Sequence, residues 1–294
     1  MPNILLLGKN GQVGWELHRA LLPLGEVIAV DAPDLDFTDL ECLRKMVLAH
    51  TPQVIINAVA YTAVDQAESQ TETVMRINAQ APGLLAELAC RLKAVLVHYS
   101  TDFVFDGTKG TAYREDDIPN PLNHYAVSKL EGDRLVLGAG GAAIVLRSSW
   151  VYSNRRDNFV KKVLEWARTR EELSVVTDSV SSPTWARDLA MATALMLVQG
   201  RANLWEWGRD HHGLYNLAGD GSASRYEWAE EILRLNPNPG EQILRTIKPA
   251  RSEDFPLPAR RPKYTPLDST RCYQTFGIKL PDWRISLRLA META

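Results

Sequence analysis

The fold is decided near the start of the chain, by Ile4-Leu5-Leu6-Leu7-Gly8-Lys9-Asn10-Gly11-Gln12-Val13-Gly14. The apolar run predicts a buried strand, and a Gly-x-x-Gly-x-x-Gly pattern opens the following helix. Gly8 permits a tight turn, Gly11 lets the backbone approach a pyrophosphate, and Gly14 lets helix and strand pack closely. The helix N-terminus offers free N–H groups to phosphates. The alternative is a glycine-rich turn that binds no ligand. The place of the motif between a strand and a helix favours a dinucleotide site.

Short apolar runs alternate with longer amphipathic runs through the first half of the chain. The expected strands lie at 4–7, 27–30, 54–56, 95–97 and 144–146, and the expected helices at 12–22, 40–49, 74–92 and 125–137. Strands that are apolar on both faces are typical of a parallel sheet covered by helices on both sides. We therefore predict a Rossmann-type, doubly wound α/β sheet in an NAD(P)-binding domain over residues 1–150.

The regular alternation of strands and helices ends after Trp150. Helices are expected at 159–170 and 185–198, and proline-rich turns follow them. We predict that residues 151–294 form mainly a smaller, substrate-binding C-terminal lobe. The boundary is soft, because helices of this second part can still pack back on the sheet.

Bulk properties exclude several classes of protein. The net charge of the 294 residues is −3 and there is no basic block, so nucleic acid is not expected as a partner. Cys42, Cys90 and Cys272 form no paired framework, which fits a reducing cytoplasm. The apolar run near the N-terminus is too short for a signal peptide or a membrane span. We therefore expect a cytoplasmic protein that does not contact membranes.

Tyr125 and Lys129 form a candidate acid/base pair. They stand four residues apart in an expected helix, so the phenol and the ammonium project from the same face. A nearby cation lowers the pKa of a phenol from its ordinary value near ~10 and makes it a usable proton carrier. Alone, this spacing equally describes two surface residues of an ordinary helix.

Asp31 ends the second expected strand, where an acid can accept hydrogen bonds from an adenosine ribose. An acid at that position favours NADH over NADPH. The alternative is that Asp31 only caps a helix or stabilises a turn. Lys9 in the glycine loop could offset the acid near a 2′-phosphate. The sequence therefore leaves NADPH or NADH open as the cofactor.

Further motifs follow in a fixed order: Asn57-Ala58-Val59-Ala60-Tyr61-Thr62-Ala63-Val64-Asp65-Gln66-Ala67-Glu68, Val97–Gly107 with Ser100-Thr101-Asp102, the Tyr125/Lys129 segment, Arg147-Ser148-Ser149-Trp150-Val151-Tyr152, and Ala259-Arg260-Arg261-Pro262. With these motifs the chain resembles the extended short-chain dehydrogenase/reductases. Within that superfamily it is most similar to the dTDP-4-dehydrorhamnose reductase family. The first of these motifs is the most specific, because it goes beyond the general pattern of the superfamily.

The resemblance implies roles for particular residues. The implied cofactor-binding residues are Gly8, Gly11, Gln12, Val13, Gly14, Asp31, Asp36, Phe37, Ala60, Tyr61, Thr62, Tyr125 and Lys129. The implied substrate-binding residues are Thr101, Asp102, Tyr125 and Trp150. The implied catalytic residues are Tyr125, Lys129 and Thr101. Taken singly, each has an ordinary structural explanation, such as a cap for Thr101 or packing for Trp150.

The reaction implied by the resemblance is the reduction of dTDP-4-dehydro-6-deoxy-L-mannose (dTDP-4-keto-L-rhamnose) to dTDP-L-rhamnose by NAD(P)H. Tyr125 would donate the proton, Lys129 would hold the cofactor ribose and lower the pKa of Tyr125, and Thr101 would hydrogen-bond the carbonyl oxygen. The alternatives are a reductase or epimerase for another dTDP-4-keto-6-deoxy sugar, and a non-catalytic NADP-binding subunit like the regulatory subunit of methionine adenosyltransferase.

Two departures from the family pattern stand out. Phe103 occupies a position where relatives often carry tyrosine, which puts one sugar contact in doubt. Some relatives form a dimer bridged by Mg²⁺ through glutamates; Glu16 and Glu292 match two of these, but Arg187 stands at the third. A cation opposes metal binding there, so Glu16 is a weak Mg²⁺ candidate. We expect a homodimer in which Arg187 pairs with a carboxylate instead.

Overall fold

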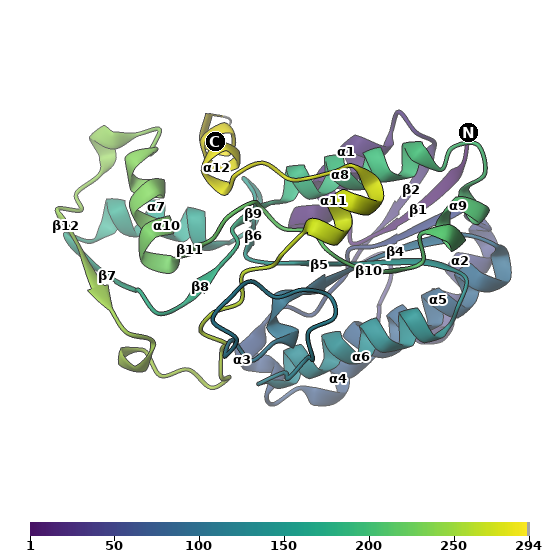
Figure 1. Cartoon of the computed structure of the whole chain (residues 1–294), viewed down its shortest axis with the longest axis horizontal. Coiled ribbons are helices and arrows are strands. Elements are labelled where there is room, and N and C mark those ends of the chain that lie inside the picture. Colours follow the sequence, from purple (N-terminus) through teal and green to yellow (C-terminus); the bar gives the residue numbers. More distant parts are fainter. Residues whose placement is uncertain (293–294) are drawn as a thin grey trace.

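The computed structural model describes residues 1–292, and in them a parallel sheet of six strands forms the centre of the molecule (Figure 1). Its order is β2-β1-β3-β4-β5-β10. The strands are β1 (Asn3–Leu7), β2 (Glu26–Val30), β3 (Val54–Asn57), β4 (Val95–Thr101), β5 (Ala142–Ser148) and β10 (Gly213–Asn216). All five neighbouring pairs are parallel. The predicted doubly wound fold class is confirmed.

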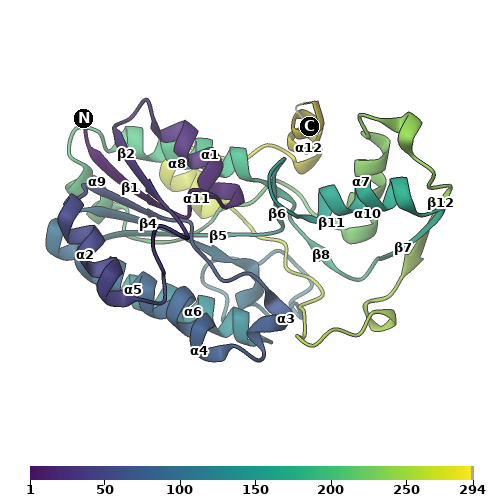
Figure 2. The ribbon, with the colours of Figure 1, turned by 180° about the vertical axis from the view of Figure 1, so that it is seen from behind.

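Helices cover both faces of this sheet (Figures 1 and 2). One face carries α1 (Gln12–Leu21), α8 (Ala186–Gln199) and α11 (Thr270–Phe276), and the other carries α2 (Leu40–His50), α5 (Ala81–Leu92) and α6 (His124–Gly138). A separate apolar cluster fills the space between the sheet and each helical layer. Two-sided burial is the reason that strands such as Leu5–Leu7 are apolar at every position.

The helix expected at 74–92 is longer and less regular than the sequence suggests. It consists of α4 (Thr71–Met75), a π-helical segment at Arg76–Gln80 and α5 without a break. Gly132 of α6 packs on the π-helical segment, where an added Cβ would lie 2.1 Å from the Asn78 carbonyl oxygen. Single π-helical turns are frequent at functional sites, and this one contains Asn78.

A smaller lobe lies beside the sheet domain and has its own apolar cluster around Trp228. Its main elements are α7 (Phe159–Thr169), β7 (Glu172–Val176), α10 (Arg225–Arg234), β12 (Thr246–Ala250) and α12 (Trp283–Glu292). The remaining short elements are α3 (Val64–Ala67), β6 (Val151–Tyr152), β8 (Val180–Ser181), β9 (Thr184–Trp185), α9 (Leu204–Asp210), β11 (Ala223–Ser224) and 3-10 turns at Asp102–Val104, Pro239–Glu241 and Ser252–Asp254. In residues 1–292, no helix is both long and apolar enough to cross a bilayer.

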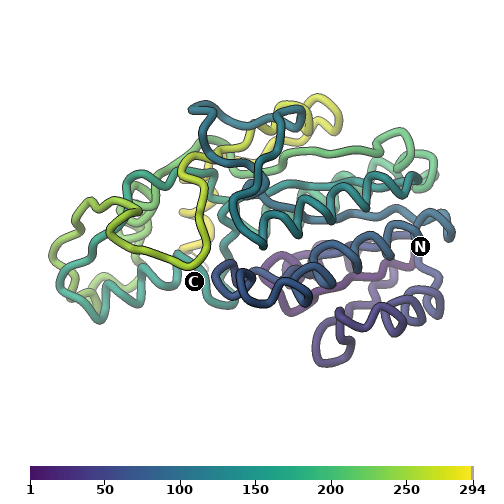
Figure 3. The backbone as a smooth tube through the Cα atoms, turned by 90° about the horizontal axis from the view of Figure 1, so that it is seen from below, coloured from purple at the N-terminus to yellow at the C-terminus, as the bar shows by residue number. Residues whose placement is uncertain are grey.

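The chain after Trp150 contributes to both parts of the molecule. Packing of later helices on the sheet was expected, and α8 does so against α1. The sequence did not reveal β10, which pairs with β5 and completes the sheet. The segment Gly213-Leu214-Tyr215-Asn216 has only four residues of mixed polarity, so it shows no strand pattern. The tube in Figure 3 shows the chain crossing between the two parts.

The strand order reverses between β1 and β3, because the chain runs from β1 outward to β2 and then returns to the other side. In open α/β sheets, ligands bind beyond the carboxyl ends of the strands at such a switch point. The carboxyl ends of these strands face the smaller lobe (Figures 1 and 2). The fold therefore predicts a binding cleft between the sheet domain and the lobe.

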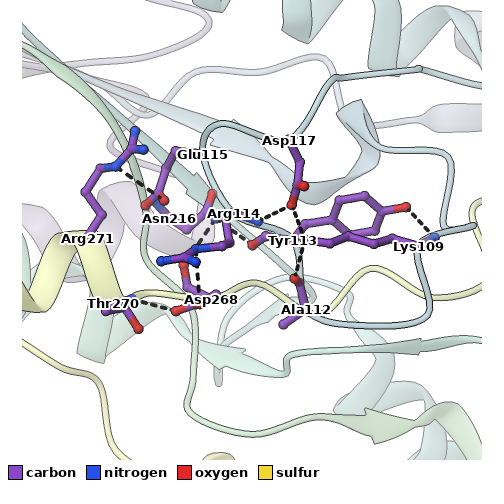
Figure 4. Close-up of polar contacts among 10 residues, drawn as sticks. All are labelled: Lys109, Ala112, Tyr113, Arg114, Glu115, Asp117, Asn216, Asp268, Thr270 and Arg271. Atoms are coloured by element: carbon purple, nitrogen blue, oxygen red, sulfur yellow. Dashed lines mark hydrogen bonds and ion pairs between the residues drawn. The ribbon is translucent and has the colours of Figure 1, made fainter.

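The long connection from β4 to α6 is fastened to the sheet domain by a polar cluster (Figure 4). Glu115 accepts a hydrogen bond of 2.7 Å from the Asn216 backbone N–H, and the Arg271 Nε lies 3.6 Å from its other oxygen. Burial raises the pKa of Glu115. The Asn216 side chain donates to the Tyr113 carbonyl at 2.9 Å. This cluster fixes a connection whose two ends carry Thr101 and Tyr125.

Candidate active site

The glycine loop has the shape that the sequence predicts for a phosphate cradle. Gly8 has a φ of +90°, in the region that favours glycine, and an added Cβ would lie 2.9 Å from the Ala58 carbonyl carbon. A Cβ on Gly14 would lie 1.8 Å from the Gly8 carbonyl oxygen, so α1 and the turn can pack together only with glycine there. Gly11 begins α1 as its N-cap and has no such clash.

A cleft of about 750 Å³ opens beyond the switch point and joins most of the expected site residues. Its lining includes the expected residues Gly11, Gln12, Val13, Ala60, Thr62, Thr101, Asp102, Tyr125, Lys129 and Trp150. Ala58, Val64, Tyr99, Ser100, Phe103, Ser148, Val151, Arg156 and Asp157 complete the described lining. The glycine loop, the end of β4 and the start of α6 therefore meet in one place.

Besides Gly8 and Gly14, which shape the loop, four expected cofactor residues lie apart from this lining. The Asp31 carboxylate accepts hydrogen bonds from the backbone N–H groups of Asn10 and Ala32, at 2.7 and 2.8 Å. Asp36 accepts hydrogen bonds from Thr38, and Phe37 is buried in an apolar cluster. The Tyr61 phenol turns away to Gln66 and Gln70. Asp31 thus supports the glycine loop here, while the roles of all four toward a cofactor stay predictions.

Tyr125 is half-buried at the start of α6 and lines the cleft. Burial raises its pKa to about 12, and a hydrogen bond with Thr101 acts in the opposite direction. The Phe103 ring meets the Tyr125 ring edge-on, with centroids 6.0 Å apart. In this environment the phenol keeps its proton at neutral pH, which is the form required of a proton donor.

Lys129 is almost fully buried one turn further along α6. Its ammonium donates to the Tyr99 carbonyl at 2.6 Å and lies 3.3 Å from Nε2 of His98. Burial lowers the pKa of Lys129 to about 8, and the charge of Asp133 partly opposes this. The expected lowering of the Tyr125 pKa by Lys129 is not supported by this geometry, because burial dominates and raises it.

Two buried polar residues, His98 and Asn57, continue the polar contacts of Lys129, and their role was not evident from the sequence. His98 is fully buried in β4, and its Nδ1 lies 3.1 Å from the side-chain amide of Asn57 at the end of β3. Burial and the neighbouring Lys129 hold the pKa of His98 well below its ordinary value, so the imidazole is neutral. A histidine within an apolar strand was the available signal, because a buried polar group needs a partner.

Asn78 of the π-helical segment supports the site through the loop at Tyr61. Its side chain is fully buried and pairs with both backbone polar groups of Tyr61, at 2.8 and 3.1 Å. A third hydrogen bond of 3.0 Å goes to the Ser128 hydroxyl. The π-helical segment therefore holds the loop with Ala60 and Thr62 against α6.

Asp102 is buried and its carboxylate is satisfied by the protein. Ser181 and Thr265 donate to one oxygen at 2.9 and 2.5 Å, and Thr101 lies 3.3 Å from the other. Burial raises the pKa of Asp102, and these hydroxyls partly offset the increase. In this structure Asp102 joins β4 to the lobe, and its contact with a substrate stays a prediction.

A second cleft of about 470 Å³ shares Phe103 and Trp150 with the first and extends into the lobe. Arg225 lies in it, with its guanidinium carbon 3.6 Å from the Trp150 ring centroid and 4.6 Å from that of Phe159. Burial lowers the pKa of Arg225 to about 9. Within residues 1–292, no carboxylate lies in ion-pair range of this cation. Arg225, missed in the sequence, is therefore a candidate for an anionic group.

The paired arginines near the C-terminal motif have different surroundings. Arg261 forms a two-point ion pair with Asp65, at 2.9 and 2.7 Å, and Asp65 also accepts from the Ala259 N–H. The pair lowers the pKa of Asp65. Arg260 is exposed and lines the second cleft. Asp65 and Arg261 thus connect the two parts of the molecule although they lie 196 positions apart in the sequence.

The carboxylates considered for Mg²⁺ do not make a metal centre in the described residues. Glu16 lies on α1, Arg187 on α8 and Glu292 at the end of α12. Among residues 1–292, no group of three His, Cys, Asp or Glu side chains is arranged to hold a metal ion. Arg187 lies with its guanidinium carbon 5.5 Å from the Trp185 ring centroid.

Comparison with known proteins agrees with this geometry. The family model described as RmlD substrate binding domain matches residues 2–294. A curated relative named dTDP-4-dehydrorhamnose reductase, from Burkholderia thailandensis, is 39% identical, with 98% of each chain covered. The chain belongs to the RmlD substrate binding domain family. The resemblance inferred from the sequence motifs is thereby confirmed.

Solved structures of this family superpose over the whole chain. A dTDP-4-dehydrorhamnose reductase ortholog from Clostridium acetobutylicum has a TM-score of 0.89 at 34% identity, covering 99% of both chains. A reductase of the same name from Bacillus anthracis, in complex with NADP, has a TM-score of 0.88 at 30% identity, covering 100% of this chain and 99% of its own. A Streptomyces antibioticus relative, 36% identical over 97% of this chain and 93% of its own, is named a probable 4-ketoreductase of another dTDP-sugar.

Proposed function

We propose that this chain reduces dTDP-4-dehydro-6-deoxy-L-mannose to dTDP-L-rhamnose with NADPH or NADH. The observation that carries the proposal is the meeting of Thr101, Tyr125 and Lys129 in the cleft that also contains the glycine loop. The names of the relatives at 39% and 34% identity support the same reaction. The NADP complex of the Bacillus anthracis relative supports a nicotinamide cofactor.

The residues present fit a dinucleotide. Gly8 and Gly14 let the loop pack closely on β3 and α1, because a Cβ at either position would meet main-chain atoms. No side chain caps the N-terminus of α1, so its first N–H groups are free for phosphates. Gln12 and Val13 line the cleft beside them. When bound, the reduced nicotinamide supplies a hydride to the C4 carbonyl carbon. Ala60 and Thr62 line the same cleft, on the loop that Asn78 holds through Tyr61.

Tyr125 gives the proton that the carbonyl oxygen gains. Its raised pKa keeps the phenol protonated until the oxygen becomes basic, and Thr101 donates a second hydrogen bond to the same oxygen. Lys129, one turn further along α6 in the same cleft, holds the cofactor ribose through its ammonium. His98 and the Tyr99 carbonyl orient the ammonium.

The second cleft receives the nucleotide portion of the substrate. Phe103 and Trp166 line this cleft with aromatic rings against which a thymine ring can pack. Arg225, which stacks on Trp150, suits the diphosphate. Trp150 has a φ of +41°, a strained conformation for a bulky residue, and it lies where the two clefts meet. This arrangement directs the sugar toward Tyr125.

The direct test is an assay with dTDP-4-keto-L-rhamnose that follows the loss of NADPH and NADH absorbance in parallel. The product is identified by NMR. We expect one reduced cofactor consumed for each molecule of dTDP-L-rhamnose formed. No cofactor consumption by the purified protein would contradict the proposal.

Tyr125→Phe tests the proton donor. General acid catalysis of this type contributes roughly 10²–10⁴-fold in rate, so we expect kcat to fall by that factor. The dissociation constant for NADPH, measured by fluorescence, should stay within about two-fold, because the ring remains. Turnover within a few-fold of the unchanged protein would remove Tyr125 from this role.

The same assay distinguishes three alternative functions. A different 4-keto-sugar reductase, as named for the Streptomyces antibioticus relative, gives cofactor consumption with another substrate or product. An epimerase consumes no cofactor net. A non-catalytic regulatory subunit shows binding to a partner protein without oxidation of NADPH, and the presence of Thr101, Tyr125 and Lys129 in one cleft disfavours it.

A homodimer remains a prediction, as does location in the cytoplasm. Exposed apolar side chains on α8 and α12, such as Met191, Leu195 and Ile285, form a candidate surface for the dimer interface. The two helices lie beside each other, since Ser286 donates to Asp188 at 2.5 Å. Light scattering of the purified protein, with and without EDTA, tests both the dimer and the expected independence from metal.

A further inference from the structure

Arg156 adopts an unusual backbone conformation beside the glycine loop. Its φ is +55°, in the left-handed region that costs free energy for residues other than glycine, asparagine and aspartate. Strained residues of this kind persist where the surrounding structure fixes them, and they gather at functional sites. The left-handed turn sets the direction in which the Arg156 side chain leaves the segment between β6 and α7.

Among the described residues, the side chain of Arg156 makes one hydrogen bond, and it goes to the glycine loop. Its Nε donates a hydrogen bond of 2.8 Å to the carbonyl oxygen of Asn10. Within residues 1–292, no carboxylate oxygen lies within ion-pair distance of its guanidinium, including the adjacent Asp157. Arg156 is exposed and lines the cleft together with Gly11, Gln12 and Asp157. The two terminal amino groups are therefore available to an anion at the loop.

The segment that carries Arg156 is fastened to the same loop by neutral contacts. The Gln12 side chain accepts from Ser153 and Asn158, both at 3.1 Å, and donates to the Val151 carbonyl at 3.3 Å. These contacts fix the distance between the segment and the N-terminus of α1. Arg156 is thus held in the same cleft as the N-terminus of α1, next to the glycine loop.

We propose that Arg156 closes the phosphate site from the lobe side, by binding the pyrophosphate of the dinucleotide with its terminal amino groups. This inference rests on the proposed function, since it requires that a nicotinamide dinucleotide binds in the cleft. A guanidinium presents parallel N–H donors that match two phosphate oxygens, and the hydrogen bond to Asn10 fixes its plane. The α1 N-terminus and Arg156 would then contact the phosphates from opposite sides.

The test is the affinity of the full chain for NADPH and for NADH, measured separately by calorimetry, together with the melting temperature. Arg156→Gly removes the cation and also relieves the backbone strain. We expect its dissociation constants for both dinucleotides to rise by about 10-fold or more, to a similar extent. The melting temperature without ligand should stay equal or rise, because glycine accepts a positive φ.

Matched variants isolate the charge. Arg156→Lys keeps a cation without the fork and should lose affinity by a smaller factor than Arg156→Gly. Arg155→Gln removes the neighbouring cation, which stacks 3.2 Å from the Trp15 ring centroid and does not line the cleft. This control should bind both dinucleotides as the unchanged protein does.

Three results would overturn the inference. Unchanged affinity in Arg156→Gly would show that the guanidinium does not bind the cofactor. A loss confined to NADPH would place Arg156 at the 2′-phosphate instead of the pyrophosphate. A parallel fall in affinity and melting temperature would indicate a purely structural role. If the unchanged protein binds neither dinucleotide, the proposed function itself fails, which distinguishes that failure from the failure of the inference.

Discussion

The two sides of the cleft are built in different ways. The sheet side consists of the glycine loop, the ends of β3 and β4 and the start of α6, and it is shaped by glycines and backbone hydrogen bonds. The lobe side consists of residues 149–158, 181, 225 and 259–265, and it is attached by side chains of distant residues. Asp65 to Arg261 and Asp102 to Thr265 are such attachments.

This difference affects how each side responds to substitution. A backbone turn that lacks room for a Cβ fails abruptly, because the clashing atoms belong to the main chain. Partly exposed side-chain attachments contribute small, separable amounts, because water competes for the same groups. We therefore expect large effects on folding from the sheet side and moderate effects on substrate binding from the lobe side.

The largest expected effect comes from Gly14→Ala. The added Cβ would lie 1.8 Å from the Gly8 carbonyl oxygen, so α1 must move away from the turn. We expect a loss of about 3 kcal/mol or more in the free energy of unfolding, measured with denaturant. Gly11→Ala is the control: its nearest contact is 3.3 Å, and its stability should change by less than about 1 kcal/mol. Equal effects of the two substitutions would contradict this view of the loop.

Lys129→Met should stabilise the folded protein while abolishing activity. Burial lowers the Lys129 pKa from 10.5 to about 8, so the protonated form is disfavoured in the fold. That shift corresponds to about 3 kcal/mol at pH 7, from which the lost contacts with Tyr99 and His98 subtract. We expect a net gain of about 1–3 kcal/mol at pH 7, measured with urea.

The pH dependence of this gain follows from proton binding. Between pH 8 and 10.5 the unfolded chain holds more protons on Lys129 than the folded chain does, so unchanged protein gains stability as pH rises. The advantage of Lys129→Met should therefore shrink over that window. Lys45→Met, at a side chain that is 73% exposed, should show no such trend. A variant that is less stable than the unchanged protein at pH 7 would show that the ammonium contacts outweigh its burial.

Thr265→Val tests the buried attachment on the lobe side. It removes a hydrogen bond of 2.5 Å to the Asp102 carboxylate, whose pKa burial already raises. We expect a cost of about 1–3 kcal/mol when Asp102 is ionised. The cost should decrease as pH falls and Asp102 becomes protonated, because the neutral acid needs this donor less. Urea unfolding at several pH values measures it, with the exposed Thr246→Val as control; a cost independent of pH would contradict the account.

The smallest effect on stability is expected for Arg261→Gln. About a third of each side chain of the Asp65–Arg261 pair is exposed, and such pairs contribute about 0–1 kcal/mol. Because the pair connects the lobe to the sheet domain, KM for the nucleotide sugar should rise several-fold with little change in kcat. Arg245→Gln, at another ion pair far more exposed, is the matched control for stability. A large loss of kcat would instead place Arg261 close to the chemistry.

The sequence was sufficient for the sheet side of the cleft. Apolar strands, helices and the glycine pattern are local signals, and five of the strands in the sheet follow them closely. Tyr125 and Lys129 are also local, since a helix places them on one face. Their electrostatics were less accessible, because the pKa of Tyr125 depends on burial that the helix alone does not reveal.

The lobe side was largely hidden from the sequence. Arg225 looks like an ordinary helix residue until Trp150 and Phe159 are found around it. Asp102 was expected to face the substrate, and the hydroxyls of Ser181 and Thr265, which enclose it, come from far along the chain. Such contacts between distant residues depend on how two parts of the chain pack together, and no periodic sequence pattern predicts them.

The late arrival of β10 has a consequence for synthesis of the protein on the ribosome. The sixth strand is residues Gly213–Asn216, so the edge of β5 stays open until most of the chain has emerged. The face of α1 that α8 covers is exposed during the same interval. A nascent or truncated chain ending near residue 150 thus exposes an apolar surface and an unpaired strand edge. We expect such a chain to aggregate or to bind chaperones.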